Sequence, residues 1–539
     1  MKIRASCVSR RFRPRHLAVL CASIGLVTGP AFAQQQTVKL ESSLRVSETV
    51  TDNAGLGQSG TGKTDWITQI SPSVRLIANG SRVNGNLSVG VNSAFYANDS
   101  APQSNHLMLG GSGKVNLVDN YAYVDVFGSI SRQSASAFGP RGADTVTGTS
   151  NQTEVRTFNV SPYLRGRLGS TGSVELRYAM TQTESDSSVL SKTQSDTWTL
   201  NASDSRASAL VGWGLDIRDS RSDVTDRGTV SQRSGRLTGF VHLDPQFTLR
   251  LIGGTESNNF GGSNKRSSTI YGVGADWRPT PRTTVSGTVE ERFFGTGYIL
   301  NATHQTGRAA FTGSFTKNVS STSQTMLGAV SLYDLLMLQY SAKYPDINER
   351  SAIVRQLIET NAAGQGGVIV GAQSVLANGF FLDRRFQLGV TYSGVRNTVS
   401  LIGFTSEHET LTERLAVTGN AAAGQNATTT GATLMISHAL SPLTSANAAY
   451  SSILSQATDR SLAGSRSNIV TAGLSTRFSP KMTGSLNIRS NQGSGSSSYT
   501  ENALIGAVAI QFWALNVRSL FRSPGQAFPA KSGPLFFLR

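Results

Sequence analysis

The most specific chemical motif in the sequence is the run Gly57-Gln58-Ser59-Gly60-Thr61-Gly62-Lys63-Thr64, which matches the pattern of a phosphate-binding loop. In a nucleotide-binding protein, such a loop follows a buried apolar strand and opens a helix whose N-terminus meets the phosphates. Here a polar stretch, 47–53, precedes the loop, and an alternating strand containing Pro72 follows it. We therefore interpret the run as a Gly/Ser/Thr-rich surface loop rather than a nucleotide site.

Other residue types that carry chemistry are scattered. Both cysteines, Cys7 and Cys21, lie near the N-terminus. No two histidines stand at a zinc-ligand spacing, so the sequence predicts neither a metal site nor a cofactor. No catalytic residues are predicted, although a serine triad needs its members to be neighbours only in space. The histidines beyond the first 33 residues are His106, His242, His304, His408 and His438.

Arginine is the more informative residue, because the chain holds 39 Arg against 10 Lys. Many arginines fall opposite the apolar positions of alternating segments. If these alternating segments are strands of a membrane barrel with its apolar face toward lipid, the arginine face lines the lumen. The pattern then predicts a cationic pore that favours anions. The competing interpretation is a ladder of ion pairs with Glu41, Glu175 and Glu290, or contacts with lipid phosphates at the rims. The predicted lumen residues are Arg45, Arg75, Arg82, Arg165, Arg167, Arg177, Arg292, Arg385 and Arg489.

The elements that position these arginines begin after a predicted secretory signal, residues 1–33. Six basic residues precede the apolar stretch Leu17–Val27, and Ala31-Phe32-Ala33 forms a small-x-small cleavage site. Cleavage there removes both cysteines, which excludes disulfides and thiolate sites in the mature chain. It also leaves 43 Lys+Arg against 33 Asp+Glu, a net charge of about +10.

Period-two alternation then recurs to the end of the chain, whereas no later segment approaches the ~18 apolar residues of a membrane helix. Val83, Leu87, Val89 and Phe95 alternate with polar residues after an Asn79-Gly80 turn. We predict one antiparallel transmembrane barrel of about 22 to 24 strands over residues 34–512, because only a closed barrel pairs its backbone groups within lipid.

Turn residues set the two rims of this barrel. Short turns suit the periplasmic rim and longer polar stretches suit extracellular loops. The stretches predicted as extracellular are Arg132–Gln152, Ser185–Ser195 and Asn258–Ser267. The tight turns are predicted at Asn79-Gly80, Asp119-Asn120, Gly169–Gly172, Asp204-Ser205, Asp244-Pro245, Arg278–Arg282, Asn378-Gly379, Ser441-Pro442 and Ser479-Pro480.

Residues 331–359 break the alternation with helical spacing. Ser331 with Asp334 resembles a capping box, and Pro345 suits a first helical turn. We predict a helical hairpin inserted between strands, either as a plug in the lumen or as a packed cap on one rim. Its predicted helix residues are Ser331, Leu335, Leu336, Pro345, Val354 and Leu357.

The last predicted strand ends on an aromatic residue, with Leu504, Val508, Ile510 and Phe512 on alternate positions. Barrel-assembly machinery reads such a strand, which makes that machinery an expected partner. Residues 513–539 contain Pro524, Pro529 and Pro534 and are predicted to form an irregular tail.

Taken in order, several segments resemble the outer-membrane β-barrel family associated with PEP-CTERM/exosortase systems and their exopolysaccharide gene clusters. The resemblance implies a Gram-negative outer-membrane location and a role in surface polysaccharide export or surface-protein sorting, without catalytic residues. The chain departs from the family in its tail beyond Phe512. The resembling segments are Thr51–Asn53, Ile70–Pro72, Leu117–Asn120, Val160–Leu164, Trp277–Thr283, Arg292–Gly295, Tyr344–Asp346 and Tyr499–Ala503.

Two functions therefore stay open beside a less favoured barrel enzyme. The first is a passive channel or scaffold for exopolysaccharide export, in which the lumen arginines meet an anionic polymer and periplasmic export components. The second is a surface-anchoring barrel with a sealed pore. Both predict contact with outer-membrane lipid and lipopolysaccharide, and neither predicts a nucleic-acid partner.

Overall fold

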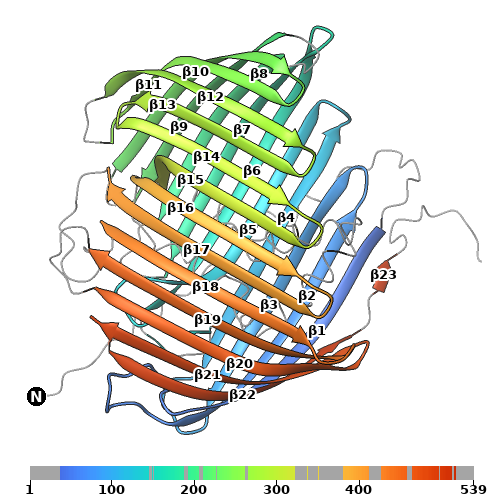
Figure 1. Ribbon diagram of the computed structural model, residues 1–539, viewed down its shortest axis with the longest axis vertical. Helices are drawn as coiled ribbons and strands as arrows, with labels where there is room; N and C mark the ends of the chain where they lie inside the picture. The colour runs from blue at the N-terminus through green and yellow to red at the C-terminus, as the bar shows by residue number, and fades with distance from the viewer. Residues whose placement is uncertain are drawn as a thin grey trace, which may run out of the picture.

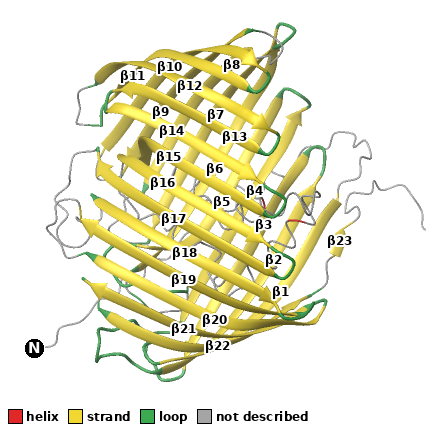
Figure 2. Cartoon of the chain, viewed as in Figure 1, coloured by secondary structure: helices red, strands yellow, loops and turns green. Residues whose placement is uncertain are grey.

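A computed structural model of the chain shows a barrel of 22 antiparallel strands (Figures 1 and 2). Every strand pairs with its neighbours in the sequence, and β22 pairs with β1 to close the ring. The predicted antiparallel barrel and its strand number are confirmed, whereas the predicted helical insert is not shown. The structure describes residues 37–144, 149, 151–186, 192–204, 210–225, 228–260, 265–321, 337, 350, 380–411, 426–457, 464–496, 498–512 and 515–517.

The strands run from 10 residues (β13) to 17 residues (β6), which suffices for a tilted crossing of the bilayer. The first half comprises β1 (Thr37–Thr51), β2 (Asp65–Asn79), β3 (Val83–Tyr96), β4 (Ser104–Val118), β5 (Ala122–Ser134), β6 (Gln152–Leu168), β7 (Gly172–Ser185), β8 (Thr193–Asp204), β9 (Val211–Val224), β10 (Gly228–Asp244) and β11 (Phe247–Asn258). The second half comprises β12 (Arg266–Thr280), β13 (Thr283–Arg292), β14 (Gly295–Gln305), β15 (Ala309–Ser321), β16 (Phe380–Ser393), β17 (Asn397–Thr410), β18 (Ala427–Ala439), β19 (Thr444–Ala457), β20 (Ser465–Ser479), β21 (Met482–Gly495) and β22 (Tyr499–Gln511).

The alternation of side chains gives the barrel an apolar outer wall. On β22, Leu504 and Val508 point outward and are 48% and 40% exposed, whereas Ile505 between them is 3% exposed. Partners in an antiparallel register share a face, so the inward or outward assignment carries from strand to strand around the ring. An apolar exterior on a closed barrel is the arrangement that lipid requires.

The two rims differ in their connections. At one, the short-turn rim, two to six residues join successive strands. The first residue of β1 and the last residue of β22 also lie at this rim. The other, the long-loop rim, carries the connections 52–64, 135–151 and 322–379. The three stretches predicted as extracellular all meet strand ends at the long-loop rim. Among the described residues, no helix is long and apolar enough to cross a membrane.

Two short turns were missed by the sequence analysis. Residues 306–308 and 394–396 connect strands at the short-turn rim, where Thr306 and Gly394 make the turn hydrogen bonds. The turn predicted at Asn378-Gly379 lies outside the described residues. The predicted signal and the six predicted helix residues of the insert lie outside the described residues.

The tail differs from the predicted irregular segment at residues Leu515–Val517, which form the short strand β23. The β22 pairing with β1 stops at Ser43, so the backbone groups of Thr37–Ser42 extend past it along that edge. β23 continues the pairing on Val38–Leu40 (Figure 1). An unpaired strand edge at the membrane is costly, which explains why tail residues pair there.

Candidate functional site in the barrel lumen

Charged side chains gather on the lumen face of β4–β13, mostly in the half nearer the short-turn rim. Neighbouring strands place these side chains opposite one another; for example, Arg165 is the register partner of Glu175, and Asp216 that of Arg236. We call this set the charge ladder. It comprises Lys114, Asp125, Arg165, Arg167, Glu175, Arg177, Asp216, Arg218, Arg236, Arg250, Asp276 and Glu290.

Ion pairs link most of the ladder. Arg177 contacts Asp125 at 2.8 Å and Glu175 at 3.0 Å, while Arg165 contacts the same Glu175 at 2.8 Å. Farther round the wall, Arg236 lies 3.4 Å from Glu290, and Arg250 lies 3.1 Å from Asp276. The ladder as defined holds seven basic and five acidic side chains, a difference of two positive charges. Pairing therefore neutralises much of the ladder's charge but leaves the ladder with a surplus of positive charge.

Aromatic rings hold Arg177 of the ladder in place. Tyr123 and Tyr163 stack with centroids 5.0 Å apart, and the Arg177 guanidinium lies 3.9 Å from the Tyr163 ring. The Lys114 ammonium lies 4.7 Å from the Tyr123 ring on the same face. Each such contact contributes about 0.5–1 kcal/mol at a partly exposed site, so the cations are ordered rather than free to fold back on the wall.

The opposite wall, β18–β20, is lined by small hydroxyl and amide side chains instead. Thr433 and Ser451 bond at 3.0 Å, Ser445 and Ser475 at 2.9 Å, and Asn447 donates to Ser475 at 3.1 Å. All five lie on lumen-facing register positions. We call these cross-strand pairs the hydroxyl wall. Figure 1 places β18–β20 on the near side of the barrel and β4–β7 on the far side.

One connection links the two walls from within. Residues 135–144, which follow β5, fold inward and reach β18–β22. Ala137 and Phe138, both fully buried, pack on Ala427 and Ala457. Ser496 donates a 2.7 Å hydrogen bond to the Phe138 carbonyl. We call this segment the inward loop.

The inward loop is fastened by a buried ion cluster. Arg489 on β21 lies between Asp144 of the loop and Glu501 on β22, and it forms ion pairs with both. Their side chains are 4%, 5% and 1% exposed. Thr51 on β1 donates to the same Glu501 carboxylate at 3.3 Å. The cluster therefore ties the loop to the strands of the barrel seam.

A second buried arginine of the loop has a different environment. Arg141 donates through Nη2 to the Ala137 carbonyl at 3.2 Å and to the Ser455 hydroxyl at 3.1 Å. The Tyr499 hydroxyl and the Asn491 amide both donate to its backbone carbonyl. No carboxylate of the described residues forms an ion pair with its guanidinium. Burial lowers the pKa of Arg141 to about 10, so it stays protonated at neutral pH.

Comparisons with known proteins return distant matches in structure alone. No family model matches the chain, and no curated protein matches it. The FrpB iron transporter of Neisseria meningitidis (F5-1 variant, apoprotein) is 11% identical, with 89% of this chain and 82% of that chain covered and a TM-score of 0.46. The siderophore receptor PirA of Acinetobacter baumannii is 8% identical over 89% and 81% of the chains, with a TM-score of 0.43. OccK2 (OpdF) of Pseudomonas aeruginosa is 8% identical over 88% and 98%, with a TM-score of 0.35. We base no functional argument on these similarities.

Eight of the nine predicted lumen arginines occupy lumen-facing register positions. Arg45, Arg75, Arg165, Arg167, Arg177, Arg292, Arg385 and Arg489 share a face with small or buried partners such as Ser71, Ser173 and Ser406. Arg82 lies instead in the β2–β3 turn, because the strand register ends at Asn79. The predicted arginines are not one cluster: Arg165, Arg167 and Arg177 belong to the ladder, whereas Arg489 fastens the inward loop.

Arg292 forms a separate buried group at the long-loop rim. Its Nη2 lies 2.6 Å from Glu256, and its Nη1 donates to Asn318 at 2.7 Å. Phe260 and Phe380 pack together beside this group, with centroids 5.1 Å apart. Arg292 is thus a structural ion pair beneath an aromatic cluster, not a pore-lining cation.

A serine, a histidine and an aspartate also meet in the lumen. Ser406 lies 3.2 Å from His408 Nε2, and His408 Nδ1 lies 3.5 Å from Asp383. However, Ser406 donates its own hydroxyl to Asp383 at 3.0 Å, so its proton points to the carboxylate rather than to the His408 imidazole that would have to accept it in a triad. Ser406 and His408 are each 3% exposed. The geometry fits a buried polar contact better than an activated nucleophile.

Sequence reasoning missed Asp144, Glu501 and most of the hydroxyl wall. Asp144 lay in a stretch interpreted as an outward loop, and nothing in its local pattern indicates a partner 345 residues away. Glu501 belongs to the segment Tyr499–Ala503, which was noted only for its resemblance to the family and was given no role. The hydroxyl wall was visible as alternating Ser and Thr, but such residues fit any polar barrel interior.

Proposed function

We propose that the protein is a passive channel of the Gram-negative outer membrane that favours anionic solutes. The observation that carries this proposal is the charge ladder, where seven basic side chains face the lumen against five acidic ones. A charged surface beside the low-dielectric membrane focuses its field into the lumen and raises the local concentration of counter-ions. The apolar outer wall and the short-turn rim support the membrane location.

The finer proposal concerns the cargo. The resemblance to barrels of PEP-CTERM/exosortase systems favours an anionic exopolysaccharide. Carboxylates of such a polymer would replace the carboxylates of the ladder as partners of its arginines, one after another along the wall. Arg165 and Arg167 suit this exchange, since they follow each other on one strand face and Arg165 is 51% exposed. Neighbouring genes for polysaccharide synthesis and an exosortase would support this cargo over small anions.

A planar-bilayer measurement tests the channel. We expect the native protein to conduct with anion selectivity, and the Arg165→Glu/Arg167→Glu double variant to shift the reversal potential toward cations. The matched control is Arg466→Glu, an exposed arginine that faces outward on β20. Cation selectivity of the native protein, or an equal shift in the control, would contradict the proposal.

The inward loop favours a second candidate, a sealed barrel that anchors or presents surface material. Its contacts with β18–β22 narrow the lumen, and its ion cluster is built to hold it there. The same recording separates the two functions. A sealed barrel conducts only when Asp144→Asn and Arg489→Gln release the loop, whereas a channel already conducts as the native protein.

A further inference from the structure

The outer wall over β8–β14 contains two adjoining hollows, which distinguish it from a smooth lipid-facing surface. The first, which we call the headgroup recess, has a volume of about 480 Å³ and is lined by Arg221, Arg233, Lys265, Asp196 and Asp219 with Trp198 beside them. These side chains face outward at the long-loop rim, since Trp198 and the β9–β10 partners Arg221 and Ser231 share the outer face.

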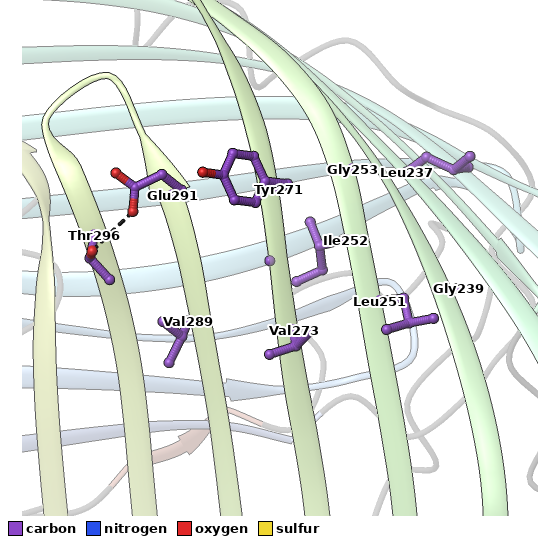
Figure 3. Close-up of a pocket in the computed structure, with 11 residues that line it drawn as sticks. Leu237, Gly239, Leu251, Ile252, Gly253, Tyr271, Val273, Val289, Glu291 and Thr296 are labelled. Carbon is purple, nitrogen blue, oxygen red and sulfur yellow. Dashed lines mark hydrogen bonds between the residues drawn. The ribbon is translucent and has the colours of Figure 1, made fainter.

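The second hollow, the acyl groove, has a volume of about 710 Å³ and lies nearer the middle of the wall. Figure 3 shows Val273, Val289 and Leu251 along it, with Tyr271, Glu291 and Thr296 at its polar end. That end lies at the long-loop rim, because Glu291 is one residue from the end of β13. Thr296 donates to Glu291 at 2.9 Å across the same end.

Glycines make the floor of the groove. Gly253 stands between Leu237 and Tyr271 in the register, and Gly239 stands opposite Leu251. A Cβ added at Gly239 or Gly253 would meet no atom within 4 Å, and neither glycine has a left-handed φ. The backbone therefore does not demand glycine here, and its missing side chains are what create the hollow.

One strand joins the two hollows. Arg233, Gly235, Leu237 and Gly239 are successive outward positions of β10, and a Cβ at Gly235 would also stand in open space. The distance along the strand from Arg233 to Leu237 is about 13 Å. A cationic recess at the rim thus continues into an apolar groove toward the membrane centre.

The recess has charge available for an anion. Arg221 and Arg233 have side chains 67% and 63% exposed. Asp219 already accepts Arg233 at 3.0 Å, Asp196 accepts the Tyr178 hydroxyl at 2.5 Å, and Asp223 beside the recess lies 3.8 Å from Arg221. The nearby acids are thus engaged, while both guanidinium groups stay largely exposed. Arginine forks bind phosphate oxygens bidentately, and Trp198 is the residue type that sits at a lipid headgroup boundary.

We propose that this wall binds a phosphorylated lipid of the outer leaflet, with its phosphate at Arg221, Arg233 and Lys265 and an acyl chain in the acyl groove. The proposal rests on the outer-membrane location proposed above but not on conduction. The occupant follows from position and charge: the surface faces lipid, its rim end is cationic, and its inner end is apolar.

The test is native mass spectrometry of the full chain in detergent, titrated with bisphosphorylated lipid A and with the same lipid after both phosphates are removed. We expect one bound lipid A and about hundredfold weaker binding without phosphates, because each of the three basic residues at a membrane surface contributes a factor of about five. Arg221→Glu/Arg233→Glu should lose binding to a similar extent. Gly253→Leu, which fills the groove, should weaken both lipids.

Arg466→Glu is the control for charge at the same rim, and heat-modifiability on gels confirms that each variant is a folded barrel. Phosphate-independent binding, equal loss in the Arg466 control, or unchanged binding in Gly253→Leu would overturn the proposal. A dimer that Gly253→Leu dissociates would identify the groove as a contact between two copies and also overturn it. Lipid binding without conduction would contradict the channel alone, and conduction without lipid binding would contradict this inference alone.

Discussion

The charge ladder and the hydroxyl wall obey the same alternation, yet they use their lumen positions differently. On β4–β13, long side chains such as Arg177 extend from the wall and pair with carboxylates two strands away. On β18–β20, short side chains such as Thr433 bond only to the adjacent strand. The first wall presents charged groups to the lumen, whereas the hydroxyl and amide groups of the second wall hydrogen-bond to one another across neighbouring strands. Alternation therefore decides which residues face the lumen, and side-chain reach decides what the lumen contains.

The largest expected effect comes from the cluster that joins the walls. Replacing Arg489 by Met leaves the Asp144 and Glu501 carboxylates buried without their cation, and we expect a loss of about 3–5 kcal/mol in the free energy of unfolding. Urea unfolding of the barrel in lipid measures it, with Arg167→Met as the control. A loss below that of the control would show that the cluster does not fasten the loop.

Within the hydroxyl wall, Thr433→Val removes the donor or acceptor that Ser451 uses while keeping the side-chain shape. Both residues are about 5% exposed, so the unpaired Ser451 hydroxyl should lower the free energy of unfolding by ~1.5 kcal/mol. Ion selectivity in a planar bilayer should stay unchanged. A change in selectivity would mean that this wall also faces the permeating ion.

A variant of the charge ladder should affect ion selectivity more than the free energy of unfolding. Arg177→Met removes two ion pairs at a site 26% exposed, and we expect a loss of only ~1 kcal/mol in the free energy of unfolding because partly exposed pairs contribute little. Selectivity for anions should fall, since the surplus of positive charge decreases. If stability fell as far as in the Arg489 variant and selectivity did not change, the ladder would be a structural element alone.

The smallest effect is expected at Arg141. Its guanidinium is as buried as that of Arg489 but has neutral acceptors, and its lowered pKa of about 10 reflects the unfavourable burial of its charge. Arg141→Met should leave the free energy of unfolding within about 1 kcal/mol of the native value, or raise it. A loss of several kcal/mol would show that its hydrogen bonds outweigh the burial of its charge.

The sequence was sufficient to predict the fold because alternation can be recognised within each strand, without knowledge of its partner strands. The same property placed Arg165, Arg167 and Arg177 on the lumen face. Pairing was less accessible: Glu175 and Glu290 were expected as partners, but Asp125 and Arg236 emerged only from the register between strands. The inward loop was beyond sequence reasoning, because Asp144 meets Arg489 only after the ring has closed.

The seam between the first and last strands has a consequence for assembly. Thr51 and Ala503 pair across nearly the whole chain, yet the entropic cost of closing such a loop exceeds that of a short hairpin turn by only about 4 kcal/mol, since the cost grows with the logarithm of loop length. Because the pairing of β1 with β22 closes the longest loop in the barrel, we expect this seam to form after the hairpins, and until it forms β1 and β22 are two open edges. β23 lengthens the seam beyond the last full strand, because it pairs with Val38–Leu40 where the β22 pairing has already ended, and it thereby shortens the open edge of β1.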